Sequence, residues 1–85
     1  MKNQTPPLPP KIQLYGVESS NIAKIGYCEK NQIIRVQFHY GGTYDYVNCK
    51  PPMYLAFKLS NSKGKFFDKY LKNNPAHKFI KVENP

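Results

Sequence analysis

The chain has 85 residues, enough for one small domain with a single core but too few for an elaborate catalytic cleft. Thirteen lysine and arginine residues oppose five acidic residues, and the formal net charge is +8. Eight lysines and only two acidic residues lie from position 50 onward, so the positive charge is concentrated in the C-terminal part. We therefore expect a polyanion as the partner. The alternative is a solvated lysine surface that only keeps the chain soluble.

The start of the chain and its cysteines indicate a cytoplasmic protein. No apolar run is long enough to span a bilayer, and no signal-peptide core follows Met1-Lys2-Asn3-Gln4. We also expect no membrane partner, because the basic helices show no exposed apolar face to insert. Cys28 and Cys49 lack the spacing of a zinc site. We expect two reduced thiols and no cofactor, with a disulfide only if the protein is exported.

A proline-rich arm, residues 1–14, precedes the folded part. The run Pro6-Pro7-Leu8-Pro9-Pro10-Lys11 predicts an extended polyproline II segment. Pro6, Pro9 and Lys11 also have the spacing of ligands for SH3-type grooves, so the arm either recruits a protein partner or is a spacer. We expect the domain to span residues 15–73 and residues 74–85 to form a C-terminal tail or edge strand.

Three consecutive segments have the pattern of antiparallel strands joined by short turns. The first lies within Val17–Cys28, where Ser19-Ser20-Asn21 is a polar turn. A second turn, Glu29–Gln32, leads to residues 33–40, in which apolar and polar side chains alternate with period two. Thr43–Cys49 is the third predicted strand. Such a meander needs one face covered.

Gly41-Gly42 predicts a tight hairpin between the second and third strands, because glycine adopts positive φ at no steric cost. The loop length decides where Tyr44 and Tyr46 point, since a shift of one residue moves every side chain to the other face. A two-residue turn places both tyrosines beside His39 and Arg35 on an exposed polar face. A three-residue loop with a bulge places them in the core. The sequence leaves both alternatives open.

Two helices follow the strands. Pro51 can open the first helix, and Ser62 is a suitable N-cap for the second. The core-facing stripe of the second helix consists of Phe66, Phe67, Tyr70 and Leu71. Pro75 ends this helix, and Phe79–Val82 forms either a short edge strand or a docked tail. The predicted fold is α+β, a three-stranded antiparallel meander covered on one face by two helices.

The start of the second helix, Ser62-Lys63-Gly64-Lys65, is the candidate phosphate site. Free N–H groups and the positive end of the helix dipole favour an anion there. Gly64 lets a phosphate approach the backbone, and Lys63 and Lys65 add charge. Alternatively, Ser62 only caps the helix, Gly64 permits close packing and the lysines are solvated. The motif lacks the full pattern of a nucleotide-hydrolysing P-loop.

Further nucleic-acid contacts are expected along the strands and the second helix. Arg35 and Lys69 are expected to contact the phosphate backbone, and Tyr44 and Tyr46 to stack on bases if they are exposed. His39 beside Tyr44 either contacts a base or is an ordinary surface residue. We expect no enzymatic activity, because the acidic residues are scattered and no nucleophile stands out beside a base.

Five segments between Val17 and Leu71 share their spacing with a known family. They are Val17-Glu18-Ser19-Ser20-Asn21-Ile22, Ile25-Gly26-Tyr27, Val36-x-Phe38, Gly42-x-Tyr44-x-Tyr46 and Ser62-Lys63-Gly64-Lys65-Phe66-Phe67. On these residues the chain resembles the KTSC domain, a module found alone in bacterial and phage proteins and at the C-terminus of some lysyl-tRNA synthetases. The association with a tRNA enzyme implies RNA binding.

Carried over residue by residue, the resemblance identifies Tyr44 and Tyr46 with the family's central Tyr-x-Tyr, and Ser62-Lys63-Gly64 with its Ser-Lys-Gly motif. Cys28 stands where an acidic residue is usual, and Lys50 where a proline is usual. The first departure removes any role of that acid, and the second alters the entry to the first helix.

These observations predict a non-catalytic nucleic-acid-binding module that favours RNA and uses a lysine-rich helix start and a Tyr-x-Tyr strand. The alternative is a protein–protein interaction adaptor without a nucleic-acid ligand. The sequence does not indicate an oligomeric state. The expected contact residues are Arg35, His39, Tyr44, Tyr46, Ser62, Lys63, Gly64, Lys65 and Lys69.

Overall fold

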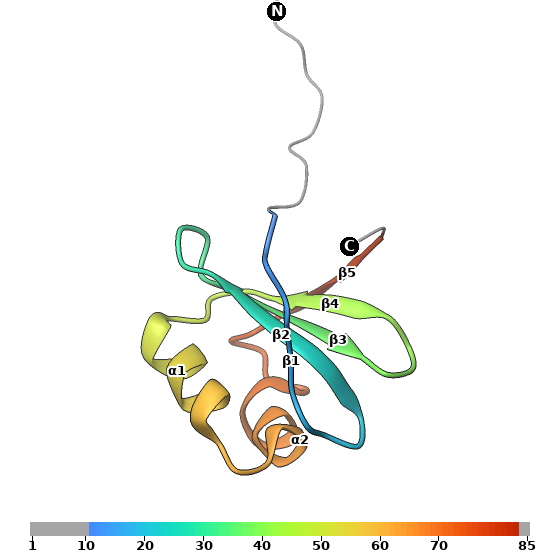
Figure 1. The fold of residues 1–85 in the computed structure, drawn as a ribbon. Helices are drawn as coiled ribbons and strands as arrows, with labels where there is room; N and C mark the ends of the chain where they lie inside the picture. Colours follow the sequence, from blue (N-terminus) through green and yellow to red (C-terminus); the bar gives the residue numbers. More distant parts are fainter. Residues whose placement is uncertain (1–10, 84–85) are drawn as a thin grey trace, which may run out of the picture.

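The computed structural model describes residues 11–83, which form an antiparallel sheet of five strands with helical segments packed against one face (Figure 1). The strand order follows the chain, so neighbours in sequence are neighbours in the sheet. The strands are β1 (Tyr15–Gly16), β2 (Ile22–Cys28), β3 (Ile33–Phe38), β4 (Thr43–Tyr46) and β5 (Phe79–Val82). The predicted α+β class and the central meander of β2, β3 and β4 are confirmed.

The sheet is larger than the three predicted strands. Phe79–Val82, expected as either an edge strand or a docked tail, pairs with β4 as β5. At the opposite edge, Tyr15 and Gly16 pair with Ile25 and Lys24. The sequence did not predict β1, because two residues are too few to show an alternating pattern. β1 and β5 are therefore the two edges of the sheet.

The hairpin between β3 and β4 has the three-residue loop. The Phe38 N–H donates to the Gly42 carbonyl at 3.0 Å, which leaves residues 39–41 in the loop. Gly41 and Gly42 have φ values of 100° and 101°, a region that favours glycine. In this register Tyr44 pairs with Val36, and Tyr46 pairs with Ile34, so both tyrosines share the face that packs on the helices.

The helical layer supplies the other half of the core. Its elements are α1 (Pro51–Leu59), α2 (Lys63–Phe66) and the π-helical segment η1 (Phe67–Leu71), which continues α2. The Ser62 hydroxyl accepts a hydrogen bond from the Lys65 N–H at 3.2 Å, which confirms the predicted N-cap. The buried core consists of Ile22, Ile25, Ile34, Val36, Tyr46, Cys49, Phe57, Phe67 and Leu71.

The outer face of the sheet, away from the helices, is crossed by the chain that leads into β1 (Figure 1). A Cβ on Gly26 of β2 would collide with the Gln13 carbonyl oxygen and meet Ile12. Residues 12–14, which the sequence assigned to the arm, therefore pack against the domain. Pro6 and Pro9 lie outside the described residues. Within residues 11–83, no helix has the length and apolar character needed to cross a membrane.

Candidate nucleic-acid interface

Tyr44 and Tyr46, the predicted base-stacking pair, belong to an aromatic cluster on the helix side of the sheet. Tyr46 is 6% exposed, and its ring meets that of Phe67 edge-on with centroids 5.3 Å apart. Tyr44 is half-buried and makes edge-on contacts with Phe38 and Phe79. Desolvation, with a smaller effect of nearby Tyr44, raises the pKa of Tyr46 to about 12. The exposed tyrosine platform is not formed, and these rings stabilise the fold instead.

Arg35 is enclosed on the outer face of the sheet. It is 4% exposed and lies directly opposite Asp45 on β4. Arg35 Nε donates to Asp45 Oδ1 at 2.7 Å, and Nη2 donates to Oδ2 at 2.9 Å. The hydrogen bond to Asp45 raises the pKa of Arg35. A guanidinium in this position cannot reach a phosphate group of a nucleic acid. This finding corrects the prediction that Arg35 contacts the phosphate backbone.

The start of α2 is occupied by the protein's own groups. The Lys63 ammonium donates to the Ser60 carbonyl at 2.7 Å. A Cβ on Gly64 would lie only 2.9 Å from Asn21 Oδ1, so the Asn21 amide fills the space that the glycine leaves. Gly64 therefore permits close packing, and Ser62 caps the helix. The sequence left two alternatives open for this helix start, a phosphate site or a packed helix cap. The structure has the packed helix cap.

Two of the predicted lysines remain at the surface of this helix. Lys65 and Lys69 are both exposed. Lys69 Nζ lies 5.3 Å from the centre of the Tyr70 ring, within the range of a cation–π contact. Both ammonium groups are accessible to a polyanion.

His39 is an exposed residue of the hairpin loop. Its Nε2 lies 3.0 Å from the Ser19 carbonyl, and its backbone N–H donates to the Asn21 carbonyl at 2.9 Å. Because the Asn21 side chain also packs on Gly64, the turn around Asn21 joins His39 to the start of α2. The structure thus brings these two predicted parts of the site together, but separates them from Arg35 and Tyr46.

A groove of about 700 Å³ lies at the β1 edge, between the sheet and the helical layer. It carries three tyrosines, two lysines and two glutamates. We call it the Tyr15 groove, and its lining residues are Tyr15, Gly16, Val17, Glu18, Ile25, Tyr27, Glu29, Tyr54, Lys58 and Lys63. Among the predicted contact residues, Lys63 alone lines this groove.

The rings of the Tyr15 groove differ in how much of their surface is free. Tyr27 and Tyr54 stack on each other, with centroids 4.8 Å apart and planes 8° from parallel. Lys58 Nζ lies 5.6 Å from the centre of the Tyr54 ring. Tyr15 is 55% exposed, and no ring or cation within residues 11–83 packs on its face. A flat ligand can therefore stack on Tyr15.

The groove also offers charges of both signs. Lys58, Glu18 and Glu29 are exposed, and Lys63 is half-buried. Within the described part of the chain, none of these four groups forms an ion pair with another residue. Their charges are thus available to a ligand that has an anionic part and a hydrogen-bond donor.

Cys49 and His77 bring a thiol and an imidazole within 3.6 Å of each other. Cys49 is fully buried, and burial raises its pKa to about 11, so the thiol keeps its proton at neutral pH. His77 Nδ1 lies 3.1 Å from the Val47 carbonyl, which only accepts hydrogen bonds. This contact favours the tautomer in which Nδ1 donates to the Val47 carbonyl. Residues 11–83 hold no cluster of three potential metal ligands among His, Cys, Asp and Glu.

Comparison with known proteins identifies the family. The model of the KTSC domain matches residues 18–74, more than half of the chain. The chain belongs to the KTSC domain family. The crystal structure of a KTSC domain protein from Yersinia pestis is similar to this KTSC domain, with a TM-score of 0.81 and 33% sequence identity over 86% of this chain and 100% of the other. Among curated proteins there is no match.

Sequence reasoning missed the aromatic part of this KTSC domain's groove. Tyr54 and Lys58 are four residues apart on a predicted helix, a spacing that places them on one face and could have indicated the pair. No local signal connects Tyr27 on β2 or Tyr15 on β1 with that face. Their contact requires the helix to be docked on the sheet.

Proposed function

We propose that this KTSC domain binds single-stranded RNA without catalysis and stacks a base on Tyr15 in the Tyr15 groove. The observation that carries the proposal is the exposed Tyr15 ring in a groove that also holds Lys58 and Lys63. An aromatic ring accepts any base by stacking, and neighbouring ammonium groups contact the phosphates. Lys65 and Lys69 extend the positive surface along the next helix.

The two glutamates of the groove favour RNA over DNA. A carboxylate repels a phosphate but accepts a hydrogen bond from a ribose 2′-hydroxyl or a base amino group. Glu18 and Glu29 have no ion-pair partner within residues 11–83 and can make such a bond. DNA lacks the 2′-hydroxyl. We therefore infer that a bound strand presents its sugars to these carboxylates and its phosphates to the lysines.

A non-catalytic role fits the side chains present. The Cys49 thiol is buried, and its raised pKa keeps it protonated at neutral pH, which does not suit nucleophilic catalysis. The acidic residues of the groove lie among exposed side chains, where they suit recognition of a ligand. Binding is thus the activity to measure.

Fluorescence anisotropy tests this function with labelled single-stranded RNA, single-stranded DNA of the same sequence and duplex RNA, across a salt series. We expect tighter binding of single-stranded RNA than of either alternative. Tyr15→Ala should weaken RNA binding by roughly 5- to 150-fold, since a stacked base contributes about 1–3 kcal/mol. Lys58→Gln should reduce the salt slope by about 0.7, the loss of one phosphate contact on a single strand.

Two control variants distinguish binding in the Tyr15 groove from nonspecific attraction by the protein's positive charge. Tyr40 is 89% exposed at the hairpin tip, and Lys30 is exposed in the turn after β2; neither lines the groove. Tyr40→Ala and Lys30→Gln should leave RNA affinity and the salt slope close to those of the unmodified protein. Equal losses from Tyr15→Ala and Tyr40→Ala would rule out the groove as the binding site. Equal, weak binding of all three nucleic acids would rule out specific RNA binding.

A further inference from the structure

β5 is an edge strand whose outer side is unpaired within residues 11–83. The Val47 N–H donates to the Lys78 carbonyl at 3.0 Å, in register with the β4–β5 ladder. Hydrogen-bonding residues alternate along an antiparallel strand. The backbone groups of Lys78 and Ile80 therefore point toward β4, and those of Phe79 and Lys81 point toward the free edge.

The side chains of β5 are unusually apolar for an edge. Phe79 is 61% exposed, and Ile80 is 62% exposed. Phe79 lies on the helix side, where its ring meets those of Tyr44 and Tyr46. Ile80 is opposite Asp45 and therefore lies on the outer face. Each face of the sheet thus has one exposed apolar side chain at this edge.

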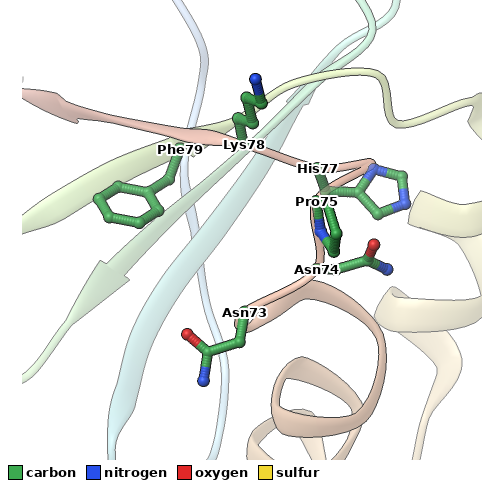
Figure 2. Close-up of a pocket in the computed structure, with 6 residues that line it drawn as sticks. All are labelled: Asn73, Asn74, Pro75, His77, Lys78 and Phe79. Atoms are coloured by element: carbon green, nitrogen blue, oxygen red, sulfur yellow. The ribbon is translucent and has the colours of Figure 1, made fainter.

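A second cavity, of about 490 Å³, begins at Phe79 (Figure 2). Figure 2 shows Pro75 and His77 on the chain that leads into β5, and the Phe79 ring turned away from them. The lining residues of the cavity are Asn73, Asn74, Pro75, His77, Lys78 and Phe79. This cavity therefore adjoins the start of β5.

The charged side chains along this edge are mostly positive. Lys78, just before β5, and Lys81 within it are both exposed. From position 69 to 83 the sequence contains one acidic residue, Glu83. An extended strand with acidic side chains is therefore electrostatically complementary to β5.

We propose that β5 is a docking edge for an extended acidic segment of another protein, which adds to the sheet as a further antiparallel strand. Main-chain hydrogen bonds to Phe79 and Lys81 provide the pairing, and side-chain pockets provide the specificity. Residues opposite each other share a face, so an apolar residue faces Phe79 and an acidic residue faces Lys81, two positions away. This surface lies at the opposite edge of the sheet from the Tyr15 groove and does not depend on RNA binding.

A second copy of the chain is a weaker candidate for this edge. Each copy has a formal net charge of +8, which opposes self-association. An acidic strand meets no such repulsion. Sedimentation of the protein alone distinguishes the two: a dimer that Lys81→Pro converts to a monomer would overturn the proposal in favour of self-pairing.

The test uses a blocked heptapeptide, Thr-Thr-Glu-Val-Val-Thr-Thr, titrated into the full chain and followed by backbone amide NMR. Its Glu faces Lys81, and its second Val faces Phe79. We expect the Phe79 and Lys81 amides to shift and to become protected from exchange. Replacing the peptide Glu by Lys should weaken binding by roughly tenfold or more, because an attraction becomes a repulsion.

Backbone pairing is tested separately from charge. Lys81→Thr removes the charge and keeps the N–H, whereas Lys81→Pro also removes an N–H that points away from β4. The proline variant should lose binding that the threonine variant retains. N-methylation of the second peptide Val should abolish binding, and N-methylation of the first, whose N–H points outward, should not. Equal effects of the two methylations, or no amide shifts at β5, would refute strand addition.

Discussion

Arg35 and Asp45 show how a single residue's role depends on the strand register. The sequence predicted that Arg35 lies on a polar face of the sheet, but it did not indicate which residue pairs with Arg35. In the register set by the three-residue loop, Arg35 and Asp45 are directly opposite and are both at least 95% buried. A shift of one residue would turn Asp45 to the other face of the sheet and break this ion pair. The pair therefore favours this register over its neighbours.

Asp45→Asn should lower the free energy of unfolding by about 3–5 kcal/mol, because it removes the carboxylate that forms the buried ion pair with the Arg35 guanidinium. Urea denaturation followed by circular dichroism measures this. Asp68→Asn is the matched control, because Asp68 is exposed on η1 and should change stability by less than about 0.5 kcal/mol. Adding Arg35→Met to Asp45→Asn should recover much of the loss. Similar midpoints for the Asp45 and Asp68 variants would contradict a stabilising pair.

Cys49 makes stability depend on alkaline pH. Burial raises its pKa in the folded protein from 9.0 to about 11. The folded state keeps a proton that the unfolded state releases, so this stabilisation is complete below pH 9 and disappears as the pH rises toward about 11. A shift of this size in the pKa corresponds to about 3 kcal/mol.

Urea midpoints measured from neutral pH to about pH 10 should therefore fall less steeply for Cys49→Ala than for the unmodified protein, although this variant starts from a lower stability. Cys28→Ala is the control for removal of a thiol, since Cys28 is only half-buried. A pH dependence that is unchanged in Cys49→Ala would assign the alkaline loss to another group, such as Tyr46.

At the scale of elements, the second helix was predicted with its cap and its apolar stripe, but not with its geometry. The Lys72 N–H donates to the Phe67 carbonyl at 2.8 Å, a π-helical bond across five residues. Phe67 and Leu71 are buried, whereas Tyr70 is 42% exposed. The wider π-helical turn thus places Phe67 and Leu71, but not Tyr70, in the core. A regular helix with 3.6 residues per turn would direct the whole predicted stripe to the core.

The contact between α2 and the turn before β2 explains why position 64 is a glycine, and this explanation can be tested. Alanine is favoured over glycine within a helix by about 1 kcal/mol. At this position its Cβ would press on Asn21 Oδ1, which Ser19 Oγ holds by a hydrogen bond of 2.9 Å. Gly64→Ala should destabilise the protein when Asn21 is present and stabilise it in an Asn21→Ala background. A urea double-mutant cycle measures this, and the same sign in both backgrounds would exclude the packing role.

At the scale of the whole molecule, the two proposed surfaces are kept apart by the order of the sheet. The Tyr15 groove is at the β1 edge, and the docking strand is β5, with three strands between them. The family match, residues 18–74, includes most of the groove and ends before β5. The proposed RNA binding and the proposed strand docking therefore involve different parts of the chain and can be tested independently.

The local features of this KTSC domain could be predicted from the order of its residues. Alternation of side chains predicted β2 to β4, Ser62 predicted the start of α2, and the lysine count predicted a basic surface. These features depend on residues close together in the chain, so their physical causes are visible in the sequence.

Which side chains are exposed and able to bind a ligand depends on how distant segments pack together. Loop length set the register that buries Tyr46 and pairs Arg35, and docking of α1 on the sheet created the Tyr15 groove from separate elements. Burial depends on contacts between distant segments, and one residue of register exchanges the two faces of a strand. The predicted exposed platform of Tyr44 and Tyr46 is therefore absent, and the proposed binding site is the Tyr15 groove at the β1 edge.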